Sequence, residues 1–143
     1  MATRSKKEEV RYAKHRSEVH TKTICVFCDY SKNDECFISE TKSFKVLVNL
    51  FPYSQWDGQG VLDHIMIVPK KHTDTLSDLS SHEAIEYVDL VSSYESKGYS
   101  VYSRAPSSTR RTVVHQHTHL MKLDDQTKKL VFYLRKPFIR IVK

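Results

Sequence analysis

Short runs of apolar and β-branched residues predict a series of strands along most of the chain. Residues 36–50 indicate two strands joined by a turn from Glu40 to Ser43. Three further runs have the length and composition of strands. They are residues 62–69, which end at Pro69, residues 99–104 and residues 130–134.

One segment has the pattern of a helix. Ser80 and Glu83 form a capping box, and Gly98 offers a left-handed stop after a run of regularly spaced apolar residues. We expect this helix to cover one face of the sheet. Residues 5–20 also open with a capping box, but their apolar positions are sparse. That segment predicts a short, loosely docked helix or a disordered arm.

Residues 113–121 carry histidines at alternate positions, namely His115, His117 and His119. Successive side chains of a β-strand point to opposite faces, so a strand here would place all three imidazoles on one side. Imidazoles serve as nucleophiles, acids, bases and metal ligands. The segment therefore predicts a chemical site, and the alternative is a surface strand that is rich in histidine.

The motif His-x-His-x-His followed by Leu120 and Met121 resembles the signature of the histidine-triad (HIT) family. Residues 46–50 and 64–72 resemble the family's nucleotide-cradling strands. The resemblance implies an α+β fold, in which an antiparallel sheet has one main covering helix, and a homodimer. We expect residues 1–22 to form an N-terminal basic arm or short helix, and residues 23–143 to form the HIT domain.

The resemblance also implies catalytic roles for the three histidines. His117 would attack the α-phosphorus of a bound nucleotide and form a covalent nucleotidyl-histidine, which water then hydrolyses. His119 would protonate or orient the leaving group. His115 would hold the site in place by hydrogen bonding or through a metal ion.

Cys25 and Cys28 have the spacing that lets two thiolates reach one ion. On its own, the pair could equally be a redox pair or two inert thiols. Resemblance to the zinc-bearing branch of the family adds His72 and His115 as ligands and implies a structural Zn²⁺ site. Cys36 lies outside this spacing, and we interpret it as a small buried residue.

Several polar residues are candidates for substrate binding. The resemblance places Asn49 at the ribose hydroxyls, although an Asn that ends a strand also satisfies local backbone groups. Thr112, Arg111 and Arg110 precede the histidine motif, where the family commonly has Gly-Gln-Ser or Gly-Gln-Thr. Hydroxyl and guanidinium groups suit a phosphate, and the alternative is a solvated basic turn. We expect His64 to be a structural histidine.

Composition limits the class of protein. A chain of 143 residues can bury a core as one domain, and its three cysteines argue against a disulfide framework. A net charge of +6 favours anionic partners. The chain has no apolar run that could span a bilayer and no apolar signal segment, so we expect no membrane partner and a cytoplasmic location.

These observations predict a hydrolase that cleaves nucleoside phosphoramidates or dinucleoside polyphosphates. One alternative is a nucleotidyltransferase or phosphorylase of the same superfamily. The other is a protein that processes or binds nucleic-acid ends, which the basic C-terminal residues permit. A nucleotide is the expected substrate, and nucleic acid is a second candidate partner.

Overall fold

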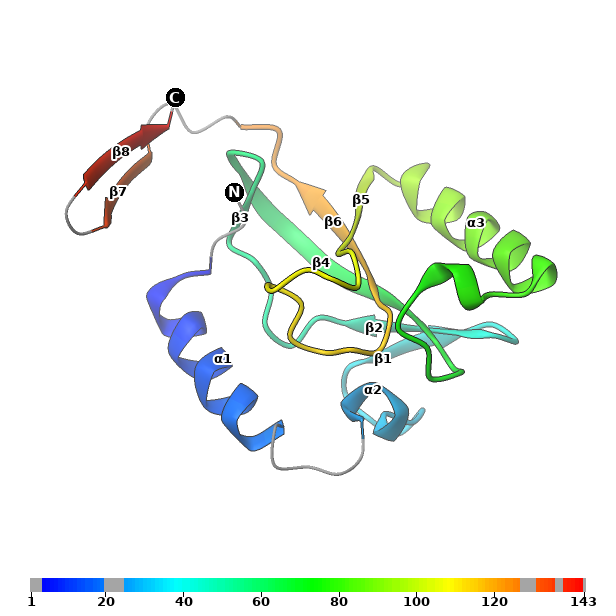
Figure 1. Ribbon diagram of the computed structural model, residues 1–143. Coiled ribbons are helices and arrows are strands. Elements are labelled where there is room, and N and C mark those ends of the chain that lie inside the picture. Colours follow the sequence, from blue (N-terminus) through cyan, green and yellow to red (C-terminus); the bar gives the residue numbers. More distant parts are fainter. Residues whose placement is uncertain (1–3, 20–24, 127–130, 136–137, 143) are drawn as a thin grey trace.

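An antiparallel sheet forms the centre of the protein (Figure 1). The computed structural model describes residues 4–19, 25–126, 131–135 and 138–142. The main strands lie in the order β1-β2-β4-β6-β5, and β3 pairs with the start of β4. The expected α+β architecture, an antiparallel sheet with a covering helix, is confirmed.

Groups of helices alternate with groups of strands along the chain. The helices are α1 (Lys6–Val19), α2 (Val26–Asp29) and α3 (Ser81–Glu95), with a 3₁₀ turn η1 (Leu76–Asp78) before α3. The strands are β1 (Phe37–Glu40), β2 (Phe44–Val48), β3 (Gln55–Trp56), β4 (Gln59–Pro69), β5 (Tyr99–Ser103), β6 (Thr118–Leu123), β7 (Val131–Arg135) and β8 (Phe138–Val142).

The long strand β4 organises the sheet because it pairs with β2 along one edge and with β6 along the other. Its apolar run is buried on both faces, as continuous hydrophobic strands are. Ile65 and Ile67 face α3, whereas Met66 and Val68 belong to a second cluster on the opposite face. The two faces therefore have separate cores.

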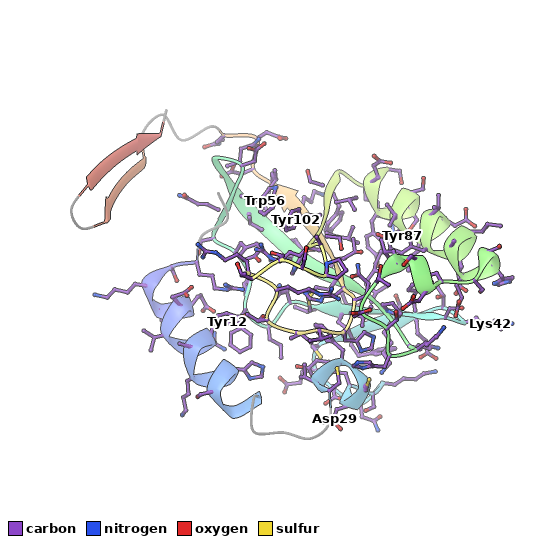
Figure 2. All side chains as sticks on the ribbon, in the orientation of Figure 1. Tyr12, Asp29, Lys42, Trp56, Tyr87 and Tyr102 are labelled. Carbon is purple, nitrogen blue, oxygen red and sulfur yellow. The ribbon has the colours of Figure 1, made fainter. Side chains whose placement is uncertain are left out.

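Helix α3 covers the first face. Its capping box is confirmed, because the Ser80 side chain accepts from the Glu83 backbone and Glu83 reaches back to Ser80. Gly98, with φ of +85°, ends the segment as expected. The Tyr87 hydroxyl reaches the sheet and lies 2.8 Å from the hydroxyl of Thr118 (Figure 2).

The second face carries α2 and the histidines. Phe27 of α2 packs with Leu47, Met66 and Val68 in one buried cluster. Cys36 is 3% exposed in the same cluster, which confirms that it is a small buried residue. The short helix thus closes one end of this face and brings its two neighbouring cysteines to the sheet.

The histidine segment departs from the expected strand. Strand β6 begins at Thr118, so His119 lies in the strand while His115 and His117 precede it. The hydrogen-bonded ladder between β4 and β6 stops at the Ile67–Thr118 pair. The next β4 residue whose backbone faces β6 is Pro69, which has no N–H group to donate. The Gln116 N–H instead donates to the carbonyl of Thr73.

The two ends of the chain add peripheral elements. At the N-terminus a helix, α1, forms, which is the first of the two predicted alternatives, but the expected domain boundary between residues 22 and 23 lies outside the described residues. A strand predicted at residues 130–134 is found as β7, which pairs with β8 in a separate hairpin. Each helix within the described ranges lacks either the length or the apolar character to cross a membrane.

Glu86 ties α3 to the turn between β1 and β2. The Ser43 N–H donates to Oε1 at 3.0 Å, and the Ser43 hydroxyl donates to Oε2 at 2.6 Å. Burial alone would raise the pKa of Glu86, but the hydrogen bonds from Ser43 outweigh it and lower the pKa to about 2.

A Glu86→Gln change should therefore destabilise the fold in a pH-dependent way. Since the folded-state pKa of Glu86 is depressed, its contribution is complete above about pH 4.5 and is lost as the pH falls toward 2. At pH 7 we expect a loss of about 1–2 kcal/mol in the free energy of unfolding, measured with urea. The difference between wild type and variant should shrink at pH 3, and an equal difference at both pH values would contradict this role.

Candidate active site and metal centre

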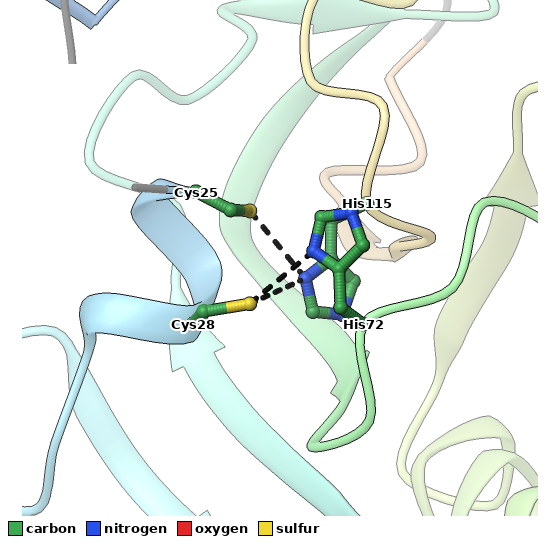
Figure 3. Close-up of side chains that lie close together, drawn as sticks. All are labelled: Cys25, Cys28, His72 and His115. Atoms are coloured by element: carbon green, nitrogen blue, oxygen red, sulfur yellow. Dashed lines mark hydrogen bonds between the residues drawn. The ribbon is translucent and has the colours of Figure 1, made fainter. Parts of the chain in front are cut away.

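Two cysteines and two histidines converge beside α2 (Figure 3). Cys25 caps the start of α2 and Cys28 lies within it, whereas His72 follows β4 and His115 precedes β6. Their ligand atoms all lie within 4.8 Å of one another. The structure thus brings together the four residues that the sequence predicted as metal ligands, in a cluster that could hold a metal ion.

The distances within this cluster suit tetrahedral coordination. Cys28 Sγ lies 3.3 Å from His72 Nδ1 and 3.5 Å from His115 Nδ1, and Cys25 Sγ lies 3.5 Å from the same His115 atom. A tetrahedral ion with metal–sulfur and metal–nitrogen bonds of about 2.3 and 2.05 Å separates sulfur from nitrogen by about 3.6 Å. These three contacts are therefore close to the sulfur–nitrogen edges of a coordination tetrahedron.

The imidazole of His115 is oriented for this role. Its Nε2 lies 2.9 Å from the carbonyl oxygen of Pro69, so Nε2–H donates and Nδ1 keeps its lone pair for the cluster. Burial lowers the pKa of His115 to about 4. The side chain is 1% exposed, and a neutral ring is the form that binds a metal.

His117 is oriented by the backbone of His115. Its Nδ1–H donates to the His115 carbonyl oxygen at 2.8 Å, which leaves the lone pair of Nε2. Burial lowers the pKa of His117 and keeps the ring neutral at pH 7. His117 also lines a cavity, so a neutral imidazole nitrogen is available as a nucleophile there.

A chain of hydrogen bonds sets the tautomer of His119. The Tyr53 N–H donates to Nδ1 of His64 at 3.1 Å, which assigns the proton of His64 to Nε2, an atom that the Asn49 side-chain nitrogen also approaches at 3.1 Å. That proton is donated to Nδ1 of His119, 2.9 Å away. His119 therefore keeps its own proton on Nε2, the atom that can donate to a ligand.

Burial keeps both rings of this chain neutral. It lowers the pKa of His64 to about 3, with a smaller contribution from the nearby Arg4 guanidinium. Burial, then the neighbouring imidazoles, then the guanidiniums of Arg104 and Arg4 hold the pKa of His119 well below its usual range. His119 is a neutral hydrogen-bond donor, in contrast to an imidazolium.

The cavity beside His117 and His119 has a volume of about 250 Å³. One part of its wall is apolar and comes from α2, β2 and the loop before β6. The predicted substrate-binding residues Asn49, Thr112, Arg111 and Arg110 all line it. The apolar residues of the wall include Val26, Phe27, Val48, Leu50, Met66 and Val113.

The four predicted binding residues differ in their present partners. Asn49 accepts from the Phe51 N–H at 2.9 Å through Oδ1, which is the local backbone role that the sequence left open. The hydroxyl of Thr112 bonds to the hydroxyl of Tyr12. Arg111 donates to the carbonyl oxygens of Val113 and Val114, so it organises its own loop, while Arg110 is exposed at the rim.

Sequence analysis missed part of the site. His64 was expected to be structural, and it also bonds directly to His119. Alternation along β4 places His64 on the same face as Met66. The contact with His119 could be seen only once the register between β4 and β6 was known. Arg4, Tyr12 and Arg104 also line the cavity. Nothing in the sequence pattern indicates that α1 docks there.

Comparisons with known proteins identify the fold. No protein-family model and no curated protein matches the chain. A HIT family hydrolase from Clostridium thermocellum matches with a TM-score of 0.55 at 22% identity, over 77% of this chain and 100% of that one. A HIT family hydrolase from Legionella pneumophila Philadelphia 1 matches at 0.51 and 20%, over 68% and 90%. A histidine triad nucleotide-binding protein from Candida albicans matches at 0.50 and 20%, over 80% and 86%.

These likenesses show that the chain has the histidine-triad fold, as its motif predicted. In the same structure His119 lies in β6, and His115 and His117 lie directly before that strand. The fold is therefore the one shared by histidine-triad proteins, and the activity has to be argued from the site itself.

Loss of one thiol should weaken metal binding. We expect about one divalent ion per purified chain, by elemental analysis, and at least tenfold weaker binding in Cys28→Ser, because even the loss of a partner that only orients a ligand costs about 10–100-fold. Cys36→Ala is the matched control and should keep its metal, since Cys36 is buried in the core. Equal metal content in Cys28→Ser and wild type would refute the cluster.

Proposed function

We propose that the protein is a nucleotide hydrolase that cleaves a phosphorus bond through a nucleotidyl-histidine intermediate. The observation that carries this proposal is the pair of neutral imidazoles with opposite roles at one cavity. His117 offers a lone pair on Nε2, and His119 offers a proton on Nε2. The centroids of the two imidazole rings lie 4.9 Å apart, and the ring planes are nearly perpendicular.

The reaction follows from these two nitrogens. Nε2 of His117 attacks the α-phosphorus, a phosphorus–nitrogen bond forms, and the bond to the leaving group breaks with its electron pair. The Nε2–H of His119 donates a hydrogen bond on the side where the leaving group departs. Water then attacks the same phosphorus, the phosphorus–nitrogen bond breaks with its electron pair returning to Nε2 of His117, and the nucleoside monophosphate leaves while one proton of the water passes to solvent.

The cavity wall supports a nucleotide as the substrate. Its apolar part, which includes Phe27 and Met66, suits a base. The Asn49 side chain suits the ribose hydroxyls, and Thr112, Arg110 and Arg111 suit a phosphate. Because Arg111 also holds the loop before His115, we assign it a positioning role as well as an electrostatic one.

We further propose that the metal centre holds a structural Zn²⁺ ion, as in a zinc-knuckle-containing branch of the fold. A set of two thiolates and two imidazoles at tetrahedral spacing is typical of zinc. Bound zinc would link these four residues to one another. It would not act as a Lewis acid on a substrate, since the protein fills all four coordination positions. It would fix His115, whose carbonyl oxygen orients His117.

Replacing the proposed nucleophile tests the mechanism. His117→Ala should lower the turnover of adenosine 5′-phosphoramidate by about 10³-fold or more while its metal content is retained. His82→Ala changes an exposed histidine of α3 and should leave turnover unchanged. Wild-type protein denatured during turnover should carry a covalent adenylyl group by mass spectrometry. Full activity in His117→Ala would rule out this mechanism.

The expected homodimer stays a prediction, as do a cytoplasmic location and nucleic acid as a second partner. Apolar side chains exposed on α3 and on the edge strand β5 support self-association. Ile85 is 64% exposed, Val88 is 60% exposed and Val101 is 42% exposed. An edge strand with such neighbours offers unpaired backbone groups and an apolar surface to a second copy.

A charge on α3 should break the proposed dimer. Val88→Glu should sediment as a monomer while wild type sediments as a dimer, because a buried carboxylate in an apolar interface is costly. Val10→Glu changes an equally exposed valine on α1 and should leave the dimer intact. A monomeric wild type, or a dimeric Val88→Glu, would show that this surface is not the interface.

A further inference from the structure

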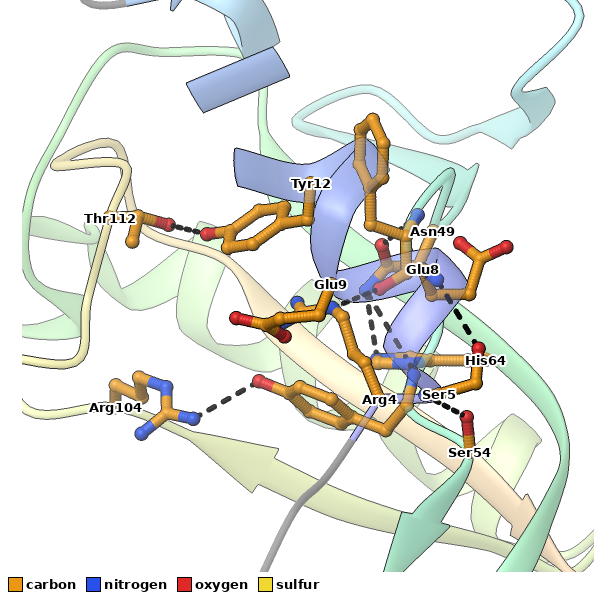
Figure 4. Close-up of polar contacts among 12 residues, drawn as sticks. Arg4, Ser5, Glu8, Glu9, Tyr12, Asn49, Ser54, His64, Arg104 and Thr112 are labelled. Atoms are coloured by element: carbon orange, nitrogen blue, oxygen red, sulfur yellow. Dashed lines mark hydrogen bonds and ion pairs between the residues drawn. The ribbon is translucent and has the colours of Figure 1, made fainter. Parts of the chain in front are cut away.

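Two arginines from distant parts of the chain, Arg4 and Arg104 (labelled in Figure 4), both contact Tyr53 in the cavity. Arg4 precedes α1, and Arg104 follows β5. The Arg4 guanidinium lies over the ring of Tyr53 at 4.7 Å from its centroid, and Nη2 of Arg104 donates to the Tyr53 hydroxyl at 3.0 Å. Both cations are therefore held in place by the same side chain.

Further aromatic contacts restrain the two guanidiniums. Arg4 also lies over Tyr12, at 4.0 Å, and its Nε donates to the carbonyl oxygen of Phe51. Arg104 also lies over Tyr102, at 5.3 Å. Stacking on aromatic faces orients a guanidinium without cancelling its charge.

Carboxylates neutralise these charges poorly. Glu9 lies 4.0 Å from Arg4, at the limit of an ion pair, and its side chain is 63% exposed, so water screens the pair. Among the described residues, no carboxylate lies within 4.0 Å of Arg104. The cavity thus contains two ordered positive charges in excess of those that the mechanism uses.

Both charges are on the side of His119. The ring of Tyr53 lies 5.8 Å from that of His119, and the ring of Tyr102 stacks on it at 6.1 Å. The tyrosines that hold the arginines are therefore the ones that pack against the imidazole facing the leaving group. Arg110 and Arg111, by contrast, come from the loop that leads to His117.

We propose that Arg4 and Arg104 form an anion subsite that selects substrates whose leaving group carries phosphate or a similar anion. This inference rests on the proposed function and deepens it, because it distinguishes between the two substrate classes that the motif permits. The guanidiniums would bind the oxygens of the departing group and stabilise the charge that it gains as the bond breaks.

The protonation state of His119 agrees with this choice. An amine leaves from phosphorus as a neutral molecule only if it receives a proton, which calls for an acid that readily gives one up. Burial and the nearby cations hold the pKa of His119 well below its usual range, so it is a neutral donor. A phosphate leaves as an anion: the phosphorus–oxygen bond breaks, the electron pair stays on that oxygen, and no proton is needed.

Three adenylates that differ only in the leaving group test the subsite. Adenosine 5′-phosphoramidate releases ammonia, adenosine 5′-phosphosulfate releases sulfate, and diadenosine triphosphate releases ADP. Because all share adenosine, any preference for the base cancels in the ratio of their kcat/KM values. Arg4→Gln and Arg104→Gln should each lower kcat/KM for the two anionic leaving groups by about tenfold or more, and for the amide by less than about twofold.

Controls separate charge from structure. Lys14→Gln removes an exposed cation from α1 and should change none of the three rates. Arg4→Lys keeps the charge and should retain part of the preference. An equal loss for all three substrates would show that the arginines are only structural and would overturn the subsite. Loss with diadenosine triphosphate alone would also overturn it, since contacts to a second nucleoside would then explain the effect.

Binding of inorganic triphosphate, measured by calorimetry, distinguishes failure of the subsite from failure of the proposed function. Affinity that falls by about tenfold in Arg4→Gln and Arg104→Gln, but not in Lys14→Gln, would support the subsite even if wild type hydrolysed none of the adenylates. In that case the hydrolase proposal alone would fail. Unchanged affinity in both arginine variants would overturn the subsite.

Discussion

The position of His115 is the constraint on which the rest of the site depends. Its Nδ1 points to the two thiols, its Nε2 donates to the carbonyl oxygen of Pro69, and its own carbonyl oxygen accepts the proton of His117. One residue therefore connects the metal centre, the end of the central strand and the proposed nucleophile. Because the side chain is almost wholly buried, a shift at any of these three contacts has to be transmitted to the other two.

Burial gives the site its chemistry as well as its shape. A solvated histidine is divided between charged and neutral forms near pH 7, and its two neutral tautomers exchange. Here desolvation keeps His64, His117 and His119 neutral; backbone groups select the tautomers of His64 and His117, and the His64 side chain selects that of His119. The proposed nucleophile and the proposed donor thus depend on hydrogen bonds to main-chain groups of His115 and Tyr53, which have a fixed geometry.

The sequence was sufficient for features with local causes. The capping box of α3 and the strands before and after it follow from local pattern and were found as expected, whereas the spacing of Cys25 and Cys28 gave only two of the clustered residues and the resemblance added His72 and His115. The strand through the histidines was wrong because Pro69, on the partner strand, ends the ladder two residues early. His64 is buried and hydrogen-bonded, as expected of a structural histidine, but its contact with His119 could not be predicted because it depends on the register between strands far apart in sequence.

The N-terminal helix shows why the cavity could not be derived from the motif alone. Its apolar pattern is weak, so local propensity gives no reason to dock it, yet Tyr12 bonds to Thr112 and packs against Phe51. These contacts involve aromatic rings and charges, which periodicity in hydrophobicity does not register. The segment predicted as a basic arm or short helix outside the domain therefore supplies part of the cavity wall. Specificity for the leaving group can then differ between proteins of this fold while the histidine motif stays the same.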